Sequence, residues 1–333
     1  MIDIQKNIPL KDFTTFNIGG EAKYFCTVKS LVELKEAITF SKEKEIPFFI
    51  LGGGSNILVA DKGYHGLVIK NEILGKKIED GRLVVCSGEI LDDVVKYSID
   101  ASLFGLENLS GIPGTIGGAT VQNAGAYGLE IKDYLYSVTG ADASSGESFI
   151  YYNSDCHFSY RTSIFKENKN LIITEIQFKL NKEFVPQLEY AGLKKFLANN
   201  EFPGPKEVRE TVLKIREEKL PDWHKLANAG SFFKNPTISQ DKFTELKNNF
   251  PQIPGFPESG DKVKVPLAWI LDNICGLKNY REGNVGLYEK QPLILVNYDN
   301  ATEKEVSAFA EKIKNIVKEK TGIEIEAEVE KEN

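Results

Sequence analysis

The sequence predicts an α+β fold in which helices and strands follow one another irregularly. Two kinds of pattern indicate this: apolar residues recur with helical spacing in some segments and alternate with polar residues in others. The chain has 333 residues, which is more than one hydrophobic core usually serves, so two or three domains are expected.

A helix and then a strand are predicted within residues 30–52. Ser30 and Glu33 have the spacing of a capping box, which marks the start of a helix. The apolar stripe of this helix consists of Leu31, Leu34, Ala37 and Ile38. The segment PFFIL then indicates a buried strand, and the apolar run ILVA follows after the loop GGGSN.

Three further elements are predicted before residue 181. LVVCSG (83–88) is typical of a strand, and ILDDVVKYSIDASL (90–103) has the pattern of an amphipathic helix. LIITEIQFKL (171–180) alternates with period two, as a half-exposed strand does.

From about residue 220 the chain becomes richer in Pro, Asn and Lys. Pro266 opens a predicted helix, PLAWILDNIC, and Gly276 closes it. The last helix starts at Thr302 with Glu305 in capping-box spacing. Its apolar face consists of Val306, Phe309, Ala310, Ile313 and Ile316. The tail GIEIEAEVE alternates apolar and acidic residues, which predicts a final strand.

The composition excludes several classes of function. The net charge of −7 argues against general nucleic-acid binding, which needs a basic face. No apolar run approaches the roughly 20 residues that span a bilayer, and the first residues do not have the pattern of a signal peptide. The four widely spaced cysteines and three histidines favour neither a disulfide framework nor a metal site.

Two glycine clusters point to a ligand that carries phosphate. LGGGSN covers residues 51–56, and GIPGTIGGATVQNAGAYG covers residues 111–128. Neither has the strand, G-x-G-x-x-G and helix order of a dinucleotide fold, and neither contains a P-loop G-K-[ST]. We therefore expect main-chain amides of loops between strands, rather than a helix dipole, to hold a diphosphate.

Seven motifs in order give a resemblance that covers residues 12–329. They are TTFNIGG (14–20), LGGGSN (51–56), GLENLSGIPGTIGGATVQNAGAYG (105–128), YRTSIFK (160–166), KLPD (219–222), AGSFFKNP (229–236) and EAEV (326–329). Together they resemble the UDP-N-acetylenolpyruvoylglucosamine reductase (MurB) family of peptidoglycan precursor synthesis. The segment LEYAGL is similar to a family branch with an extra loop that carries a tyrosine and folds over the substrate.

This resemblance implies a fold like that of vanillyl-alcohol oxidase (PCMH-type), with a two-part FAD-binding domain and a smaller α+β substrate-binding domain. The expected ranges are 1–70 and 71–218 for the two FAD-binding parts and 219–333 for the substrate domain, whose C-terminal strand returns to the active site. The family binds FAD non-covalently and uses NADPH as the hydride donor, without a metal. It reduces UDP-N-acetylglucosamine enolpyruvate to UDP-N-acetylmuramate.

The resemblance also assigns roles to single residues. Arg161 is the expected cation for the substrate carboxylate, and Ser231 is the expected proton donor. Glu328 is the acid expected to polarise the enolate or to tune the proton donor. The pattern has one departure, because Ala327 stands where the family usually has proline. Cofactor binding is expected at Thr15, Gly52, Gly53, Gly54, Ser55, Asn56, Ile112, Pro113, Gly114, Gly117, Gly118, Gln122, Asn123, Gly125, Ala126 and Tyr127.

Substrate binding is expected at Tyr160, Tyr190, Lys219, Asn235 and Gln291. Considered singly, each of these residues also fits a surface or structural role, and Ser231 also fits a turn. Two other functions stay open: another FAD-dependent oxidase or dehydrogenase of the same fold, and a non-catalytic nucleotide-sugar binding protein. The resemblance further implies a cytoplasmic monomer whose partner is a small molecule, with no nucleic-acid or membrane partner.

Overall fold

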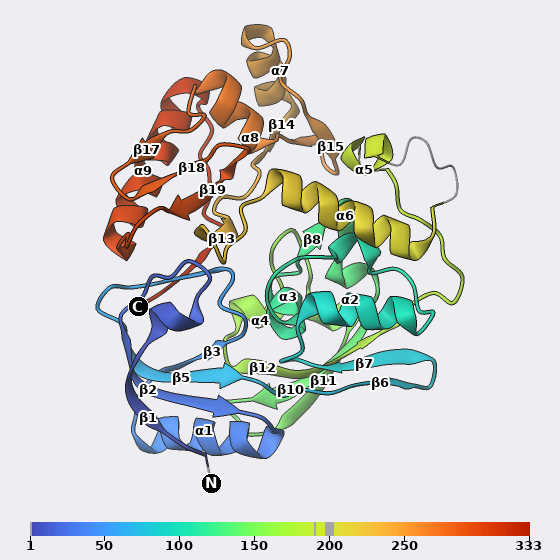
Figure 1. Cartoon of the computed structure of the whole chain (residues 1–333), viewed down its shortest axis with the longest axis vertical. Coiled ribbons are helices and arrows are strands. Elements are labelled where there is room, and N and C mark those ends of the chain that lie inside the picture. The colour runs from blue at the N-terminus through green and yellow to red at the C-terminus, as the bar shows by residue number, and fades with distance from the viewer. Residues whose placement is uncertain (1, 190, 197–202) are drawn as a thin grey trace. The chain divides into compact units, whose positions relative to one another are not determined.

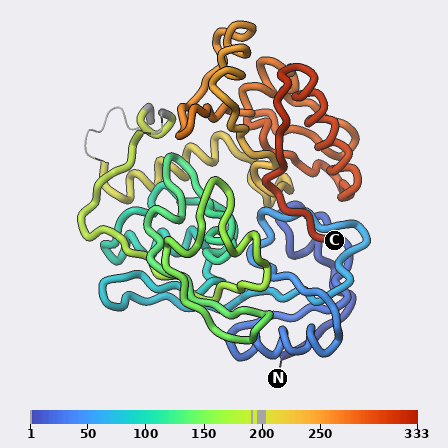
Figure 2. The backbone as a smooth tube through the Cα atoms, turned by 180° about the vertical axis from the view of Figure 1, so that it is seen from behind, coloured from blue at the N-terminus to red at the C-terminus, as the bar shows by residue number. Residues whose placement is uncertain are grey.

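The computed structural model describes residues 2–189, 191–196 and 203–333 (Figures 1 and 2). The chain folds into two compact units. Unit 1 contains residues 1–8, 22–53 and 65–218, and unit 2 contains residues 9–21, 54–64 and 219–333. Within the described ranges, no helix has both the length and the apolar character needed to cross a membrane.

The first sheet of unit 1 has the strand order β1-β2-β5-β3. Its strands are β1 (Gln5–Pro9), β2 (Glu21–Val28), β5 (Tyr64–Asn71) and β3 (Phe48–Leu51), and β3 runs parallel to β5. Helix α1 (Leu31–Glu43) buries Leu34, Ala37 and Ile38 in a core that includes Leu67 and Ile69 of β5.

The second sheet of unit 1 is antiparallel, with the order β11-β10-β12-β7-β6. Its strands are β11 (Ser148–Tyr152), β10 (Leu135–Asp142), β12 (Leu171–Phe178), β7 (Arg82–Cys86) and β6 (Lys76–Glu79). The remaining elements of unit 1 are helices α2 (Leu91–Asp100), α3 (Ile116–Val121), α4 (Ile164–Glu167), α5 (Ala191–Phe196) and α6 (Pro205–Lys219) and the short strands β8 (Gly125–Ala126) and β9 (Leu129–Glu130).

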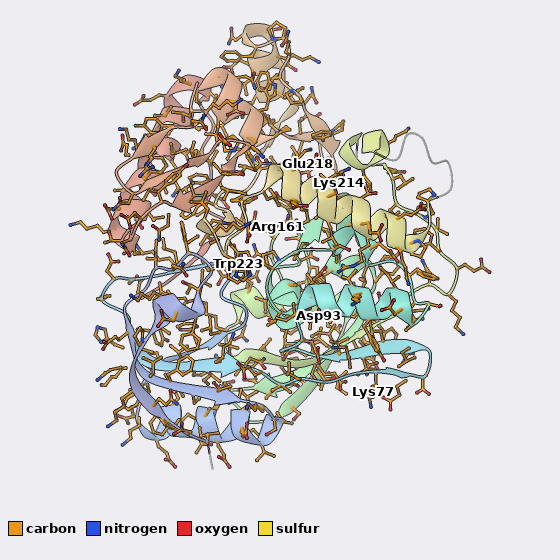
Figure 3. All side chains as sticks on the ribbon, viewed as in Figure 1. Lys77, Asp93, Arg161, Lys214, Glu218 and Trp223 are labelled. Atoms are coloured by element: carbon orange, nitrogen blue, oxygen red, sulfur yellow. The ribbon has the colours of Figure 1, made fainter. Side chains whose placement is uncertain are left out.

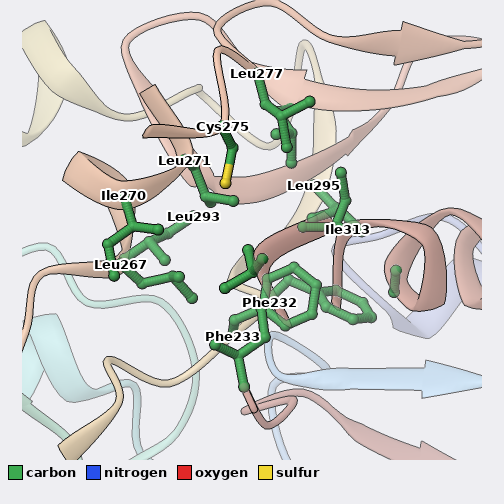
Figure 4. Packing of buried hydrophobic residues seen from close by; sticks show 14 of the residues in the cluster. Phe232, Phe233, Leu267, Ile270, Leu271, Cys275, Leu277, Leu293, Leu295 and Ile313 are labelled. Atoms are coloured by element: carbon green, nitrogen blue, oxygen red, sulfur yellow. The ribbon is translucent and has the colours of Figure 1, made fainter. Parts of the chain in front are cut away.

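Unit 2 is built around a sheet with the order β13-β19-β18-β17 and a smaller sheet with the order β14-β16-β15. These strands are β13 (Ala227–Ser231), β19 (Gln291–Asn297), β18 (Val285–Tyr288), β17 (Arg281–Glu282), β14 (Thr237–Ser239), β16 (Lys262–Lys264) and β15 (Phe256–Glu258). The helices are α7 (Gln240–Asn249), α8 (Leu267–Trp269) and α9 (Glu303–Thr321). Buried side chains of these elements form one apolar core (Figure 4).

The chain end of unit 2 pairs with an early segment of the sequence. Strand β20 (Glu330–Glu332) runs parallel to β4 (Ile57–Val59), which follows the loop GGGSN. Figure 2 shows the red C-terminal segment ending beside this blue segment. Residues 273 positions apart, such as Glu330 and Ile57, are therefore neighbours in one unit.

Most elements that the sequence predicts are confirmed. Ser30 caps α1 by accepting the N–H of Glu33, and both halves of the capping box between Thr302 and Glu305 are present in α9. Gly322 ends α9 with a φ of +70°, the left-handed conformation that favours glycine. All four cysteines are free. The mixed α+β class is thus observed.

Two of the predicted elements differ from the observed ones. The tail 322–330 is not a continuous strand: it makes an isolated bridge at Ala327 and joins a strand only at Glu330, because only a short segment around Phe233 runs beside it. The helix predicted at 266–275 is confirmed in place, but after α8 it widens into a π-helix over Ile270–Ile274. π-Helical turns are rare and are frequently found at functional sites.

Candidate active site

The first glycine loop, Gly52–Gly54, packs so closely against neighbouring segments that no side chain larger than that of glycine fits. In unit 1, a Cβ on Gly52 would lie 2.7 Å from the Thr115 hydroxyl oxygen, and a Cβ on Gly53 would lie 2.5 Å from the Cα of Gly114. In unit 2, Gly54 has a φ of +65°, and a Cβ there would lie 2.0 Å from the carbonyl oxygen of Phe13. Backbone segments approach one another too closely for any larger residue.

This loop also offers main-chain donors. Within the described part of the chain, the N–H groups of Gly53 and Gly54 donate to no protein group. The loop leads into strand β4, as the sequence predicts, and not into a helix. Glycine-rich backbone with unused N–H groups is suited to an anion, so these residues fit the diphosphate of FAD.

The second glycine cluster contains a helix that the sequence analysis did not predict. α3 starts after Thr115, but its first three N–H groups already have acceptors. Ile116 donates to the carbonyl of Glu89 at 2.8 Å, and Gly117 donates to that of Ser87 at 2.9 Å. Gly118 donates to the Thr115 hydroxyl at 3.3 Å. The first three N–H groups of α3 are therefore all bonded within unit 1.

Gly111, at the start of this cluster, is held from both sides. Asp92 on α2 accepts its N–H at 2.6 Å, and Arg216 on α6 donates to its carbonyl at 3.0 Å. Asp92 also accepts two hydrogen bonds from Arg209 on α6, at 2.5 and 2.7 Å. Burial acts to raise the pKa of Asp92, but the hydrogen bonds from Arg209 and Gly111 outweigh burial, and the pKa is lowered.

The side chains of three other residues of the cluster make hydrogen bonds within unit 1. Asn123 is fully buried, and its amide donates to Glu130 and to the carbonyl of Ser159. Gln122 accepts from Lys166, and Tyr127 hydrogen-bonds Arg216. Direct contacts of Asn123 with a cofactor would therefore come from its main chain. Ile112, Pro113, Gly125 and Ala126 lie in the same cluster.

Arg161 lies in a tight turn of unit 1 between Ser159 and Thr162, which exchange two main-chain hydrogen bonds. Its φ is +57°, a conformation that residues other than glycine rarely adopt and that clusters at functional sites. The guanidinium donates to the carbonyl of Gly125 at 2.8 Å and lies 5.0 Å from the ring centroid of Tyr160. Figure 3 labels this residue.

In unit 2, Thr15 joins the glycine loop to strand β13. Its hydroxyl donates to the carbonyl of Asn228 at 2.7 Å, and its N–H donates to that of Gly54 at 3.0 Å. Thr15 is 5% exposed. The two bonds fix the end of the loop against the strand that carries Ser231.

Ser231 follows a β-bulge. The pairing of β13 with β19 shifts between Asn228 and Ser231, and Gly230 has a φ of +71°. A bulge redirects the side chains that follow it, which is why bulges are frequent beside active sites. Ser231 is half-buried, and the next two residues, Phe232 and Phe233, are buried with their rings 5.1 Å apart (Figure 4).

Main-chain hydrogen bonds bring the segment of Glu328 beside that of Ser231. The N–H of Glu328 donates to the carbonyl of Phe232 at 2.8 Å. Lys234 donates its N–H to the carbonyl of Glu326 at 3.0 Å, so the bridge between Phe233 and Ala327 does not use the N–H of Ala327. A proline at position 327 would therefore remove no donor from this pairing.

The other predicted substrate residues differ in their surroundings. Gln291, at the start of β19, has a buried Oε1 without a hydrogen-bond partner among the described residues. Asn235 accepts the N–H of Leu267 at 2.9 Å and so caps α8. Lys219 is exposed at the end of α6. Tyr190 lies outside the described residues.

The sequence analysis missed one charged residue at the glycine loop. Lys70 on β5 donates a hydrogen bond to the carbonyl of Gly52. In the parallel pairing of β3 with β5, Lys70 lies beside Leu51 and is therefore close to Gly52, the next residue. The sequence shows only a lysine that follows the apolar run LVI. This lysine becomes informative only once the pairing of β3 with β5 is known.

Comparisons with known proteins agree with this architecture. Residues 22–148 match the family model of an FAD binding domain, and residues 222–331 match that of the UDP-N-acetylenolpyruvoylglucosamine reductase C-terminal domain. The chain is similar to the crystal structure of UDP-N-acetylenolpyruvylglucosamine reductase (MurB) from Thermus caldophilus, with a TM-score of 0.73 and 26% identity over the whole of both chains.

Full-length relatives give the same result. The UDP-N-acetylenolpyruvoylglucosamine reductase of Flavobacterium johnsoniae is 40% identical, over 98% of this chain and 99% of the relative. That of Chromobacterium violaceum is 36% identical, over 98% of both. With an FAD-binding domain of the expected type and relatives of this identity along its whole length, the chain belongs to the UDP-N-acetylenolpyruvoylglucosamine reductase family of FAD-dependent oxidoreductases.

Proposed function

We propose that this protein reduces UDP-N-acetylglucosamine enolpyruvate to UDP-N-acetylmuramate in peptidoglycan precursor synthesis, using FAD and NADPH. The observation that carries the proposal is the hydrogen bond between Phe232 and Glu328, because it places the candidate proton donor Ser231 and the candidate acid on adjacent segments of unit 2. The family to which the chain belongs supports the same reaction.

FAD supplies the redox chemistry, since it accepts hydride from NADPH and passes it to the enolpyruvyl group. The N–H groups of Gly53 and Gly54, which donate to no protein group in the described ranges, would bind the diphosphate. Main-chain atoms of the second glycine cluster would also contact FAD. The full set proposed to contact FAD is the one that the sequence analysis assigns, with Asn123 acting through its main chain.

Ser231 would give the second carbon of the enolpyruvyl group its proton. A serine hydroxyl is a weak acid in water, but a fixed position next to a carbanionic carbon makes the transfer feasible. The bulge at Gly230 and the buried Phe232 and Phe233 restrict the main chain of Ser231. A restricted donor loses little orientational freedom when the substrate arrives.

Charge develops on the substrate carboxylate as an enolate before protonation. Arg161 would bind this carboxylate through its guanidinium, which stays charged at any working pH. Glu328 would polarise the enolate or tune the proton donor. The turn that holds Arg161 at a φ of +57° supports a demanding positional role, because such a conformation costs free energy.

Recognition of the nucleotide sugar would involve Tyr160, Tyr190, Lys219, Asn235 and Gln291. The buried Oε1 of Gln291 has no partner among the residues that the structure describes, which supports a bond to a ligand, since a buried polar atom without a partner is costly. Lys219 would meet the UDP diphosphate as a cation, in a chain with a net charge of −7. A tyrosine-bearing substrate loop of the kind found in one family branch is part of this proposal.

The proposal includes a cytoplasmic monomer that acts on a small molecule, binds neither nucleic acid nor membrane, and needs no metal.

One experiment distinguishes this function from the two other candidates, another FAD-dependent oxidase or dehydrogenase and a non-catalytic nucleotide-sugar binding protein. The purified protein is reduced anaerobically with NADPH while the flavin absorbance is followed, and the enolpyruvyl substrate is then added. Bleaching followed by full recovery is the expected result. Bleaching without recovery would favour another flavoenzyme, and a colourless protein that FAD cannot reconstitute would favour a non-catalytic binding protein.

A further inference from the structure

Lys70 is a half-buried cation at the first glycine loop. It lies on β5, and its ammonium group donates to the carbonyl oxygen of Gly52. Burial lowers the pKa of Lys70, and the nearby Glu72, which directly follows β5, acts in the opposite direction. A lysine kept at a desolvated position needs compensation, because removing an ammonium ion from water is costly.

The carbonyl that Lys70 contacts belongs to the same peptide unit as the N–H of Gly53. A trans peptide is planar, so its C=O and N–H point in opposite directions, and no cis peptide bond occurs in the ranges that the structure describes. The N–H of Gly53 donates to no protein group within the described residues. The peptide therefore has a cation at its oxygen end and an unused donor at its nitrogen end.

Such an arrangement strengthens the donor. A hydrogen bond to a carbonyl oxygen polarises the peptide, and chains of hydrogen bonds reinforce one another in a low-dielectric interior. The loop cannot turn away, since Gly52 and Gly53 pack directly against Thr115 and Gly114. The N–H of Gly53 is thus fixed in direction and made more positive, which is what a phosphate oxygen requires.

We infer that Lys70 is a positioning residue for the FAD diphosphate: its ammonium group orients and polarises the Gly52–Gly53 peptide so that the N–H of Gly53 binds a phosphate oxygen. The inference rests on the proposed function for the identity of the anion. It assigns to Lys70 a contribution to cofactor affinity and none to proton or hydride transfer.

The test compares FAD binding to apoprotein variants by quenching of flavin fluorescence. Lys70→Met removes the charge and the donor while keeping the length of the side chain, and Lys70→Arg keeps both. Lys77→Met is the control, because Lys77 is an exposed lysine of unit 1 that pairs with Glu79 (Figure 3). The apoprotein melting temperature of each variant separates a loss of affinity from a loss of folding.

We expect Lys70→Met to raise the Kd for FAD by about tenfold to a hundredfold, the range expected when one charged hydrogen bond is lost. Lys70→Arg should stay close to the wild type, and Lys77→Met should have no effect. The Kd for riboflavin, which has no phosphate, should change little in Lys70→Met. A wild-type Kd for FAD in Lys70→Met, or equal losses for FAD and riboflavin, would overturn the inference. Failure of the wild-type protein to bind FAD would instead overturn the proposed function.

Discussion

The side-chain amide of Asn56 donates a hydrogen bond of 3.3 Å to the main-chain carbonyl of Glu328. The carbonyl of Asn56 in turn accepts the N–H of Glu330 at 3.0 Å. One residue at the end of the glycine loop thus fixes the segment that carries the candidate acid. The glycine loop and the segment of Glu328 are therefore expected to depend on each other.

Replacing Asn56 with Ala should expose this dependence. The substitution removes the bond to Glu328, which should cost about 1 kcal/mol of unfolding free energy. It should also slow flavin reoxidation by the enolpyruvyl substrate, because Glu328 loses one of its restraints. Urea denaturation and stopped-flow reoxidation check the two effects. Unchanged reoxidation in a variant with the expected loss of stability would show that this bond is only structural.

Replacing Gly54 with Ala should destabilise the protein strongly. The new Cβ would lie 2.0 Å from the carbonyl oxygen of Phe13 at a φ of +65°, so the backbone must shift. We expect a loss of more than about 2 kcal/mol. Gly260→Ala is the matched control, since Gly260 has a φ of +73° with nothing within 4 Å of its Cβ position. Equal melting temperatures for the two variants would contradict the steric argument.

The pair between Asp92 and Arg209 should make stability depend on pH in the acid range. The folded-state pKa of Asp92 lies below its ordinary value of 3.8, so the ionised carboxylate is favoured by folding. This contribution is complete above the unfolded pKa and disappears as the pH falls through the folded pKa. Arg209→Met should therefore lower the melting temperature at pH 7 and have a shrinking effect below about pH 4.

Asp100→Asn is the control for that series. Asp100 and Lys206 form an exposed pair, 3.6 Å apart, between the same two helices, α2 and α6. Exposed pairs contribute little, so this variant should resemble the wild type at every pH. A pH-independent loss in Arg209→Met would mean that its packing, rather than its charge, supports α6.

Replacing Ala327 with Pro should be tolerated. The hydrogen bonds beside the bridge to Phe233 use the N–H groups of Glu328 and Lys234, so a proline at 327 removes no donor from them. The melting temperature and the rate of flavin reoxidation should stay within error of the wild type. Lys234→Pro, which removes a donor that is used, should lower the melting temperature. A large loss in Ala327→Pro would contradict the geometry of this bridge.

The sequence predicts the elements whose signals are local. The capping residues Ser30 and Thr302 correspond to observed helix starts, because each signal depends on a few adjacent residues. The prediction of a continuous strand over residues 322–330 is wrong, because alternation of apolar and acidic residues does not supply a partner strand. The family motifs name candidate site residues, but their roles stay predictions.

Contacts that depend on tertiary register could not be predicted. Lys70 reaches Gly52 only because β3 and β5 pair in parallel with Leu51 beside Lys70. The bonds of Asp92 to Gly111 and Arg209 likewise join segments 19 and 117 positions apart. No pattern within any one segment contains this information, since it arises from how the helices pack.

The most direct test of the account is the pair of half-reactions in Ser231→Ala, measured anaerobically by stopped-flow absorbance of the flavin. If Ser231 donates the proton, reduction by NADPH should proceed at the wild-type rate, and reoxidation by the enolpyruvyl substrate should slow by about a hundredfold or more. Equal rates in the variant and the wild type for both half-reactions would contradict the assignment and leave Ser231 as a serine that ends a strand.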